Sequence, residues 1–370
     1  MKIWKLKFDV NKYNIWSFTD RTNLLDKCDS FDGCKKLDSW EPIKISRIDS
    51  DGAKGANAMG TDFSMPIVDK KVIGSIKGFV GNSVEFLPIL LDDDDYNMAD
   101  FYILNVTERL AGIDFEKSDY NKFSDGVGIL KFNKIIFKKN MVMGKHIFKA
   151  ENDRFGTNYI SDELKQKIEN SNLKGFYFEL VWDSENEKAA EEFKENERLK
   201  REEKTNAYKS MKSGMVKEWS EDEWITAVMT WIWGKMGNSS GDIFSTIQKL
   251  PVPCQYIFSM YSLKWEIENG GYNQFFYNFN MEIARLAMKG FQELELKDLA
   301  LITKDAIETY GEMESENKRG ENDSVEDFMD TYNVNPLDAS TGYFISSFSL
   351  DKLEEKSIEY IKNHVECFGD

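Results

Sequence analysis

The 370-residue sequence has only two histidines, His146 and His364, and neither stands in a recognisable pattern with a nucleophile. Nucleophilic catalysis by serine or cysteine needs a base held beside the nucleophile. The run GNSSG at 237–241 has the spacing G-x-S-x-G, but it follows a predicted helix and not the strand that leads into a nucleophile-bearing turn. These absences argue against acyl-transfer chemistry, and we expect no catalytic residue and no enzyme activity.

Cysteine is also scarce, with four residues at Cys28, Cys34, Cys254 and Cys367. They show no paired zinc spacing and are too few for a secreted disulfide framework. We therefore expect reduced thiols in a cytoplasmic protein, with a Cys28–Cys34 bridge in their Asp/Ser/Gly-rich loop as the alternative. His364 lies one helical turn from Cys367, but no second pair of ligands accompanies them, which favours packing over a metal site.

No apolar run is long enough to cross a membrane. The most apolar stretch, 224–236, is interrupted by Thr226, Thr230 and Gly234 and is shorter than the roughly 20 residues that a span requires. The first eight residues alternate polar and apolar side chains, unlike the continuous apolar core of a secretion signal. The sequence predicts no signal peptide, no membrane segment and no membrane partner.

Charge is abundant but uneven. The net charge is −17, and residues 218–370 carry 28 acidic and 12 basic side chains, whereas residues 1–217 carry 37 and 36. Such a field repels nucleic acid and anionic membranes and attracts basic protein surfaces, more weakly as salt increases. Direct nucleic-acid binding is therefore disfavoured. The alternative is that the acidity only maintains solubility.

Residues 1–183 show mostly extended patterns. Trp4, Leu6 and Phe8 alternate with polar residues, and β-branched or aromatic runs occupy 101–106, 128–137 and 175–182. One helix is predicted at 161–170, where Ser161 is the N-cap. This first domain is predicted to be α+β.

Residues 184–217 consist mainly of Glu, Lys, Arg and Asn at helical spacings, which predicts a charged helical linker. From Ser220 the apolar period becomes helical, and Ser220 with Glu223 forms a capping-box pattern. Further helices are predicted at 253–269, 281–294, 296–310, 325–332 and 350–365. Residues 218–370 are therefore predicted to form an all-α domain, with Trp231, Trp233 and Trp265 in its core.

Two stretches suggest chemistry but have simpler explanations. The carboxylates of Asp92 to Asp95 suit a hard cation, as in a metal-dependent hydrolase, yet an acidic turn explains them equally well. The glycine-rich run from Gly52 to Gly60 matches no phosphate-binding or dinucleotide-binding motif. We expect neither a metal nor a cofactor, and the metal-dependent enzyme is the third hypothesis for function.

The most specific local pattern is the segment from Trp265 to Asn278, WEIENGGYNQFFYN. Asn269 and Gly270 are predicted to end a helix, with glycine in the left-handed conformation, and the aromatic residues that follow pack back against it. A tight corner between helices accounts for this spacing. The candidate binding residues here are Glu266, Glu268, Asn269, Gly270, Gly271, Asn273 and Gln274.

The segment 311–330 is the most acidic part of the chain, and a solvated loop would explain it. It also supplies a candidate acidic surface for a partner. The candidate residues are Glu312, Glu314, Glu316, Glu321, Asp323, Glu326 and Asp327.

Two resemblances accompany these patterns. Around the Asn269–Gly271 corner, residues 218–368 resemble the C-terminal domain family of a bacterial DNA-mimic protein. Residues 1–183 resemble bacterial immunity proteins found beside polymorphic toxins, through 116–119, 145–148, 159–164 and 173–178. The resemblances imply a non-catalytic protein that binds either a cognate toxin or a basic DNA-binding protein. In a DNA mimic, carboxylates would take the place of phosphates.

Overall fold

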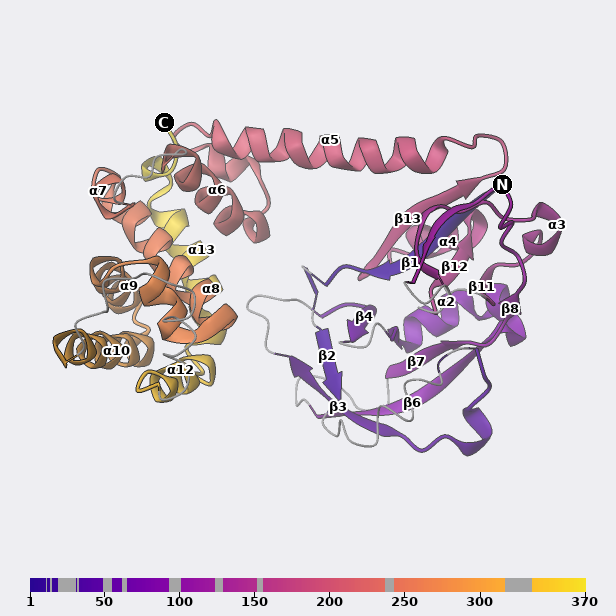
Figure 1. Ribbon diagram of the computed structural model, residues 1–370, viewed down its shortest axis with the longest axis horizontal. Coiled ribbons are helices and arrows are strands. Elements are labelled where there is room, and N and C mark those ends of the chain that lie inside the picture. The colour runs from indigo at the N-terminus through magenta and orange to yellow at the C-terminus, as the bar shows by residue number, and fades with distance from the viewer. Residues whose placement is uncertain are drawn as a thin grey trace. The chain divides into compact units, whose positions relative to one another are not determined.

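The computed structural model divides the chain into two compact units, Met1–Leu199 and Lys200–Asp370. It describes residues 1–10, 12–13, 15–18, 31, 33–48, 55–61, 65–92, 101–123, 129–151, 156–236, 243–316 and 335–370. Figure 1 shows strands and helices in the first unit and helices in the second. The predicted fold class, α+β followed by all-α, is confirmed. The division falls within α5 (Ala189–Lys209), the charged helix of the predicted linker.

A five-stranded sheet forms one layer of the first unit. Its strands are β1 (Lys2–Phe8), β8 (Arg109–Leu110), β11 (Ile147–Ala150), β12 (Asn158–Ser161) and β13 (Phe176–Asp183), in the order β13-β1-β12-β11-β8. Strand β1 lies antiparallel between β12 and β13. Its alternation is confirmed, because Trp4 and Leu6 enter one core cluster and Ile3 enters another.

Six further strands close into a barrel that the sequence patterns did not predict. They are β2 (Ile15–Phe18), β3 (Ile43–Ile48), β4 (Ala58–Thr61), β5 (Ile67–Asp69), β6 (Val84–Asp92) and β7 (Phe101–Val106). The barrel order is β2-β3-β6-β7-β5-β4. Trp16, Ile45, Leu87 and Ile103 belong to its apolar core cluster. The Trp16 indole N–H donates to the Met59 sulfur at 3.0 Å.

Helices α2 (Lys70–Val80) and α4 (Asp162–Asn170) pack against each other and share a core with β1 and barrel residues. Helix α4 and its Ser161 cap are confirmed, since the Ser161 hydroxyl accepts from the Leu164 N–H. Helix α2 was not predicted. The Asp69 carboxylate caps it, and Val72 and Ile76 are buried. A short helix α3 (Lys139–Val142) and the ribbon β9 (Asp119–Lys122) with β10 (Ile129–Lys134) complete the unit.

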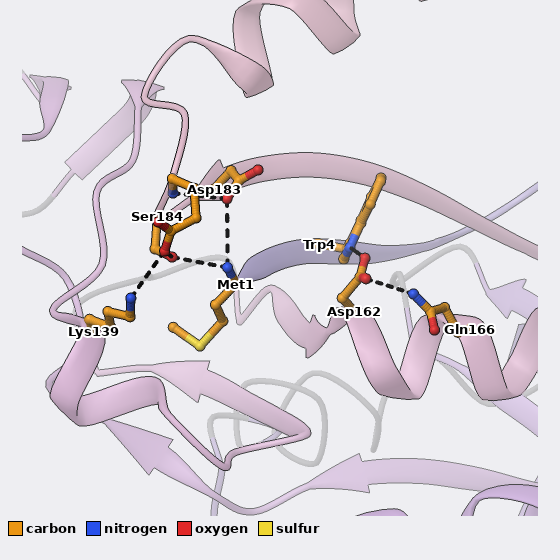
Figure 2. A network of polar contacts seen from close by, with 8 residues as sticks. Met1, Trp4, Lys139, Asp162, Gln166, Asp183 and Ser184 are labelled. Carbon is orange, nitrogen blue, oxygen red and sulfur yellow. Dashed lines mark hydrogen bonds and ion pairs between the residues drawn. The ribbon is translucent and has the colours of Figure 1, made fainter.

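Polar contacts also hold the beginning of β1 (Figure 2). The Met1 ammonium donates to the Ser184 hydroxyl at 2.9 Å and lies 3.7 Å from the Asp183 carboxylate. Within β1, the Trp4 indole N–H donates to the Asp162 carboxylate at 2.9 Å. These contacts join β1 to the end of β13 and to the start of α4.

The second unit consists of helices around one apolar core. They are α6 (Trp224–Met236), α7 (Ile243–Ile247), α8 (Val252–Asn278), α9 (Met281–Glu293), α10 (Lys297–Glu316), α12 (Asp338–Ile345) and α13 (Leu353–Asn363). The Ser220–Glu223 capping box is confirmed. Helices α7 and α12 were not predicted, and the helix predicted at 325–332 lies outside the described residues. None of the described helices is long and apolar enough to cross a membrane.

One core prediction is partly wrong. Trp231 is buried, but Trp233 and Trp265 each leave 43% of their surface exposed. Helix α6 is apolar around most of its circumference, so its composition alone does not show which side packs. The Trp233 ring still contacts Phe258, with 5.3 Å between centroids.

Candidate functional site

The glycine pair at 270–271 breaks α8 into two helical segments. Gly271 has φ 78° and ψ −177°, a conformation that is essentially restricted to glycine. The prediction of a helix corner is confirmed, but the positive φ belongs to Gly271 and not to Gly270, whose φ is −160°. Neither position has space for a side chain. A Cβ at Gly271 would lie 2.9 Å from Thr341 Oγ1, and a Cβ at Gly270 would lie 2.1 Å from Gln274 Oε1.

Tyr272 fixes the inner side of this corner. Its backbone N–H meets the Thr341 hydroxyl of α12 at 3.1 Å, and its phenol lies 3.0 Å from the Thr303 hydroxyl of α10. Its ring packs edge-on against Phe344. Burial raises the pKa of the Tyr272 phenol, with the Thr303 hydrogen bond opposing that rise. The corner is therefore attached to two further helices, which hold the segments of α8 in place.

On the outer side, one carboxylate joins the two segments of α8. Glu266 Oε2 accepts from Gln274 Nε2 at 2.8 Å and from Asn278 Nδ2 at 2.7 Å. We call these three residues the Glu266 network. Gln274 and Asn278 are four residues apart and so share one helix face. Within the described parts of the chain, no lysine or arginine forms an ion pair with Glu266.

The other predicted binding residues do not all join this network. Glu268 forms an ion pair with Lys264 at 2.7 Å, and Asn269 is exposed. Asn273 and Gly271 are buried. The sequence prediction thus included Glu266 and Gln274 but missed Asn278. Asn278 lies four residues after Gln274, and this spacing could have placed both amides on one helix face.

Two exposed aromatic residues adjoin the network in the chain. Trp265 precedes Glu266 and is 43% exposed, and Tyr277 precedes Asn278 and is 47% exposed. The Trp265 ring is supported edge-on by Tyr261, with 5.8 Å between centroids. The outer side of the corner therefore presents a carboxylate and two amides, and exposed aromatic residues precede Glu266 and Asn278 in the sequence.

The predicted acidic surface is described only in part. Glu312 is exposed on α10, and Glu314 and Glu316 lie in the same helix, although their side chains are outside the described residues. Glu321, Asp323, Glu326 and Asp327 also lie outside them. This surface stays a prediction.

His146 contacts a serine that no sequence motif linked to it. His146 Nδ1 lies 2.9 Å from Ser161 Oγ. Ser161 is only 4% exposed, and its hydroxyl accepts the Leu164 N–H as the cap of α4. Because the hydroxyl is buried and already engaged, this pair links β12 and α4 to the segment before β11.

The candidate metal and phosphate stretches give no assembled site in the described residues. No group of three His, Cys, Asp or Glu side chains there could hold a metal ion. His364 Nδ1 lies 2.9 Å from the Tyr360 carbonyl oxygen. Asp92 ends β6, and residues 93–95 lie outside the described chain, as do residues 52–54 of the glycine-rich run.

Comparison with known proteins gives two family matches, one in each unit. Residues 81–183 match the immunity protein family Imm11, and residues 248–364 match the DMP19-like protein family. No curated protein matches the chain. The first match runs from the short helical turn before β6 to the end of β13, and the second contains α8, α9, α10, α12 and α13. The chain therefore carries one segment similar to the Imm11 immunity protein family and another similar to the DMP19-like protein family, as the two sequence resemblances predicted.

Proposed function

We propose that this chain is an immunity protein that neutralises a cognate bacterial toxin by binding it, without catalysis. The observation that carries this proposal is the Imm11 match over residues 81–183. That segment supplies four of the five strands of the sheet and two strands of the barrel, so it forms most of the framework of the first unit.

A second candidate function is a DNA-mimic regulator that occupies the DNA-binding surface of a partner protein. It is supported by the DMP19-like match and by the excess of acidic over basic residues in 218–370. A basic DNA-binding groove responds mainly to negative charge along a backbone, and carboxylates supply charge of that sign. The same charge disfavours direct binding of nucleic acid.

We also place the protein in the cytoplasm. Cys254 is buried, and burial raises the pKa of its thiol to about 12. The protonated thiol donates to the Cys367 carbonyl oxygen at 3.0 Å. This contact uses the reduced form of the residue, which fits a reducing compartment.

Co-expression with a candidate toxin encoded by a neighbouring gene tests the leading proposal. Cells should survive toxin expression only when the full chain is present, and the two proteins should co-purify. Equal killing with and without the chain, together with no complex, would refute it.

A pull-down with the full chain distinguishes the second candidate. A DNA mimic should capture a nucleic-acid-binding protein that added DNA and added salt both release. Capture of a non-basic protein that is insensitive to salt would count against DNA mimicry.

A further inference from the structure

We propose that the Glu266 network is a recognition site for an arginine side chain of a protein partner. This proposal rests on the proposed function only in that the chain acts by binding a protein. It assigns the chemistry of one contact within the DMP19-like segment, on the outer face of the α8 corner.

The network leaves one oxygen of the Glu266 carboxylate available. Both amide donors contact Oε2, and no hydrogen bond to Oε1 is formed by any residue that the structure describes. Neutral amides orient the carboxylate without cancelling its charge. Two other carboxylates of this unit differ in this respect, because Glu268 is paired with Lys264 and Glu308 with Lys304.

The carboxylate is also held in one position before any partner binds. Gln274 and Asn278 fix its orientation from the far side of the helix break, and the Thr341 and Thr303 contacts of Tyr272 hold that break. A side chain that is already ordered loses less conformational entropy on binding. Glu266 is therefore better prepared for a cation than a freely rotating surface glutamate.

The chemistry of a fixed carboxylate favours arginine over lysine. The planar guanidinium forms directional hydrogen bonds to carboxylates and also stacks on aromatic rings, whereas the ammonium of lysine is a compact, strongly hydrated charge. Trp265 and Tyr277, each adjacent in sequence to a member of the network, are exposed aromatic residues. The excess negative charge of residues 218–370 attracts basic proteins and repels phosphate-bearing ligands.

Titration of the full chain with two labelled peptides tests the proposal. One peptide alternates arginine with glycine, and the other replaces each arginine with lysine. We expect the arginine peptide to bind the wild-type chain more tightly. Glu266→Gln should weaken its binding by about tenfold, as expected for loss of one charged hydrogen-bonded contact, whereas Glu308→Gln, with the same charge change, should weaken it less than about twofold.

Two further variants separate orientation from charge. Gln274→Ala with Asn278→Ala keeps the net charge but removes both donors to Glu266, and Trp265→Ala removes one exposed ring. Each should weaken binding of the arginine peptide more than that of the lysine peptide, while the circular dichroism spectrum stays that of the wild type.

Equal losses for Glu266→Gln and Glu308→Gln, or no preference for arginine in the wild-type chain, would overturn the proposal. Neither result concerns toxin neutralisation, which the co-expression experiment measures separately. Conversely, failure of the chain to protect cells from the toxin leaves the peptide comparison unchanged.

Discussion

Replacement of Gly271 by alanine should selectively destabilise the helical unit. Gly271 has φ 78° and ψ −177°, and an added Cβ would lie 2.9 Å from Thr341 Oγ1 and 3.2 Å from Thr341 Cγ2. The backbone conformation alone costs about 1–3 kcal/mol for a residue other than glycine. Displacement of Thr341 would also remove the acceptor of the Tyr272 N–H, which adds about 1 kcal/mol.

These contributions predict a loss of about 2–4 kcal/mol in the free energy of unfolding. For a unit of this size, that corresponds to a fall in Tm of roughly 10 °C. Urea and thermal unfolding followed by far-ultraviolet circular dichroism would measure it, because most of the helices belong to this unit.

The matched control is Gly342→Ala on α12. Gly342 lies next to Thr341 in a helix, and an added Cβ there would have no neighbour within 4 Å. Alanine should raise stability at this position by about 0.5–1 kcal/mol, since glycine is a poorer helix former. If Gly271→Ala and Gly342→Ala unfold at the same urea concentration, the assignment of strain to Gly271 is incorrect.

Three further changes should have measurable effects. Tyr272→Phe should cost about 1–2 kcal/mol in urea unfolding, because it leaves the buried Thr303 hydroxyl without its partner, and adding Thr303→Val should reduce that cost. Ser220→Ala should cost about 1 kcal/mol by removing the capping box that precedes α6. The pKa of Glu163 is lowered from 4.5, first by its backbone hydrogen bond at the start of α4 and then by the Ser161 hydroxyl. The stabilisation from Glu163 is therefore present above pH 4.5 and is lost as the pH falls through the lowered pKa, so Glu163→Gln should weaken the acid dependence of unfolding.

Local signals predicted much of the secondary structure. Strand β7 has the predicted bounds, and the Ser161 cap and the Ser220–Glu223 capping box occur where the residue patterns place them. Helix α2 was missed because Gly74 and Gly78 lower its intrinsic helix propensity. The burial of its apolar face outweighs that preference, and burial depends on elements that are distant in sequence.

The pairings that close the barrel were beyond local reasoning. Strand β2 runs parallel to β4, and β3 runs parallel to β6, so the strand order does not follow from adjacent hairpins. Alternation of side chains shows which residues of a strand share a face but not which strand lies beside it.

The candidate site was predicted in position but not in orientation. The helix corner appeared in the sequence, yet the break at Gly271 resets the rotation of the helix that follows. After this reset Asn273 turns inward, whereas Gln274 and Asn278 reach Glu266. The 3.6-residue period predicts which residues share a face only within one continuous helix, so it cannot predict the faces of the segment after the break.

The position of β1 between β12 and β13 has a consequence for synthesis of the chain. During translation, β1 leaves the ribosome about 150–170 residues before its two neighbouring strands, which at about 5–20 residues per second is a delay of roughly 10–30 s. Throughout that time Trp4 and Leu6 lack the partners that bury them in the finished sheet. Unpaired apolar strands promote aggregation of nascent chains, so the yield of folded protein should depend on chaperones that bind this first segment while the rest of the unit is made.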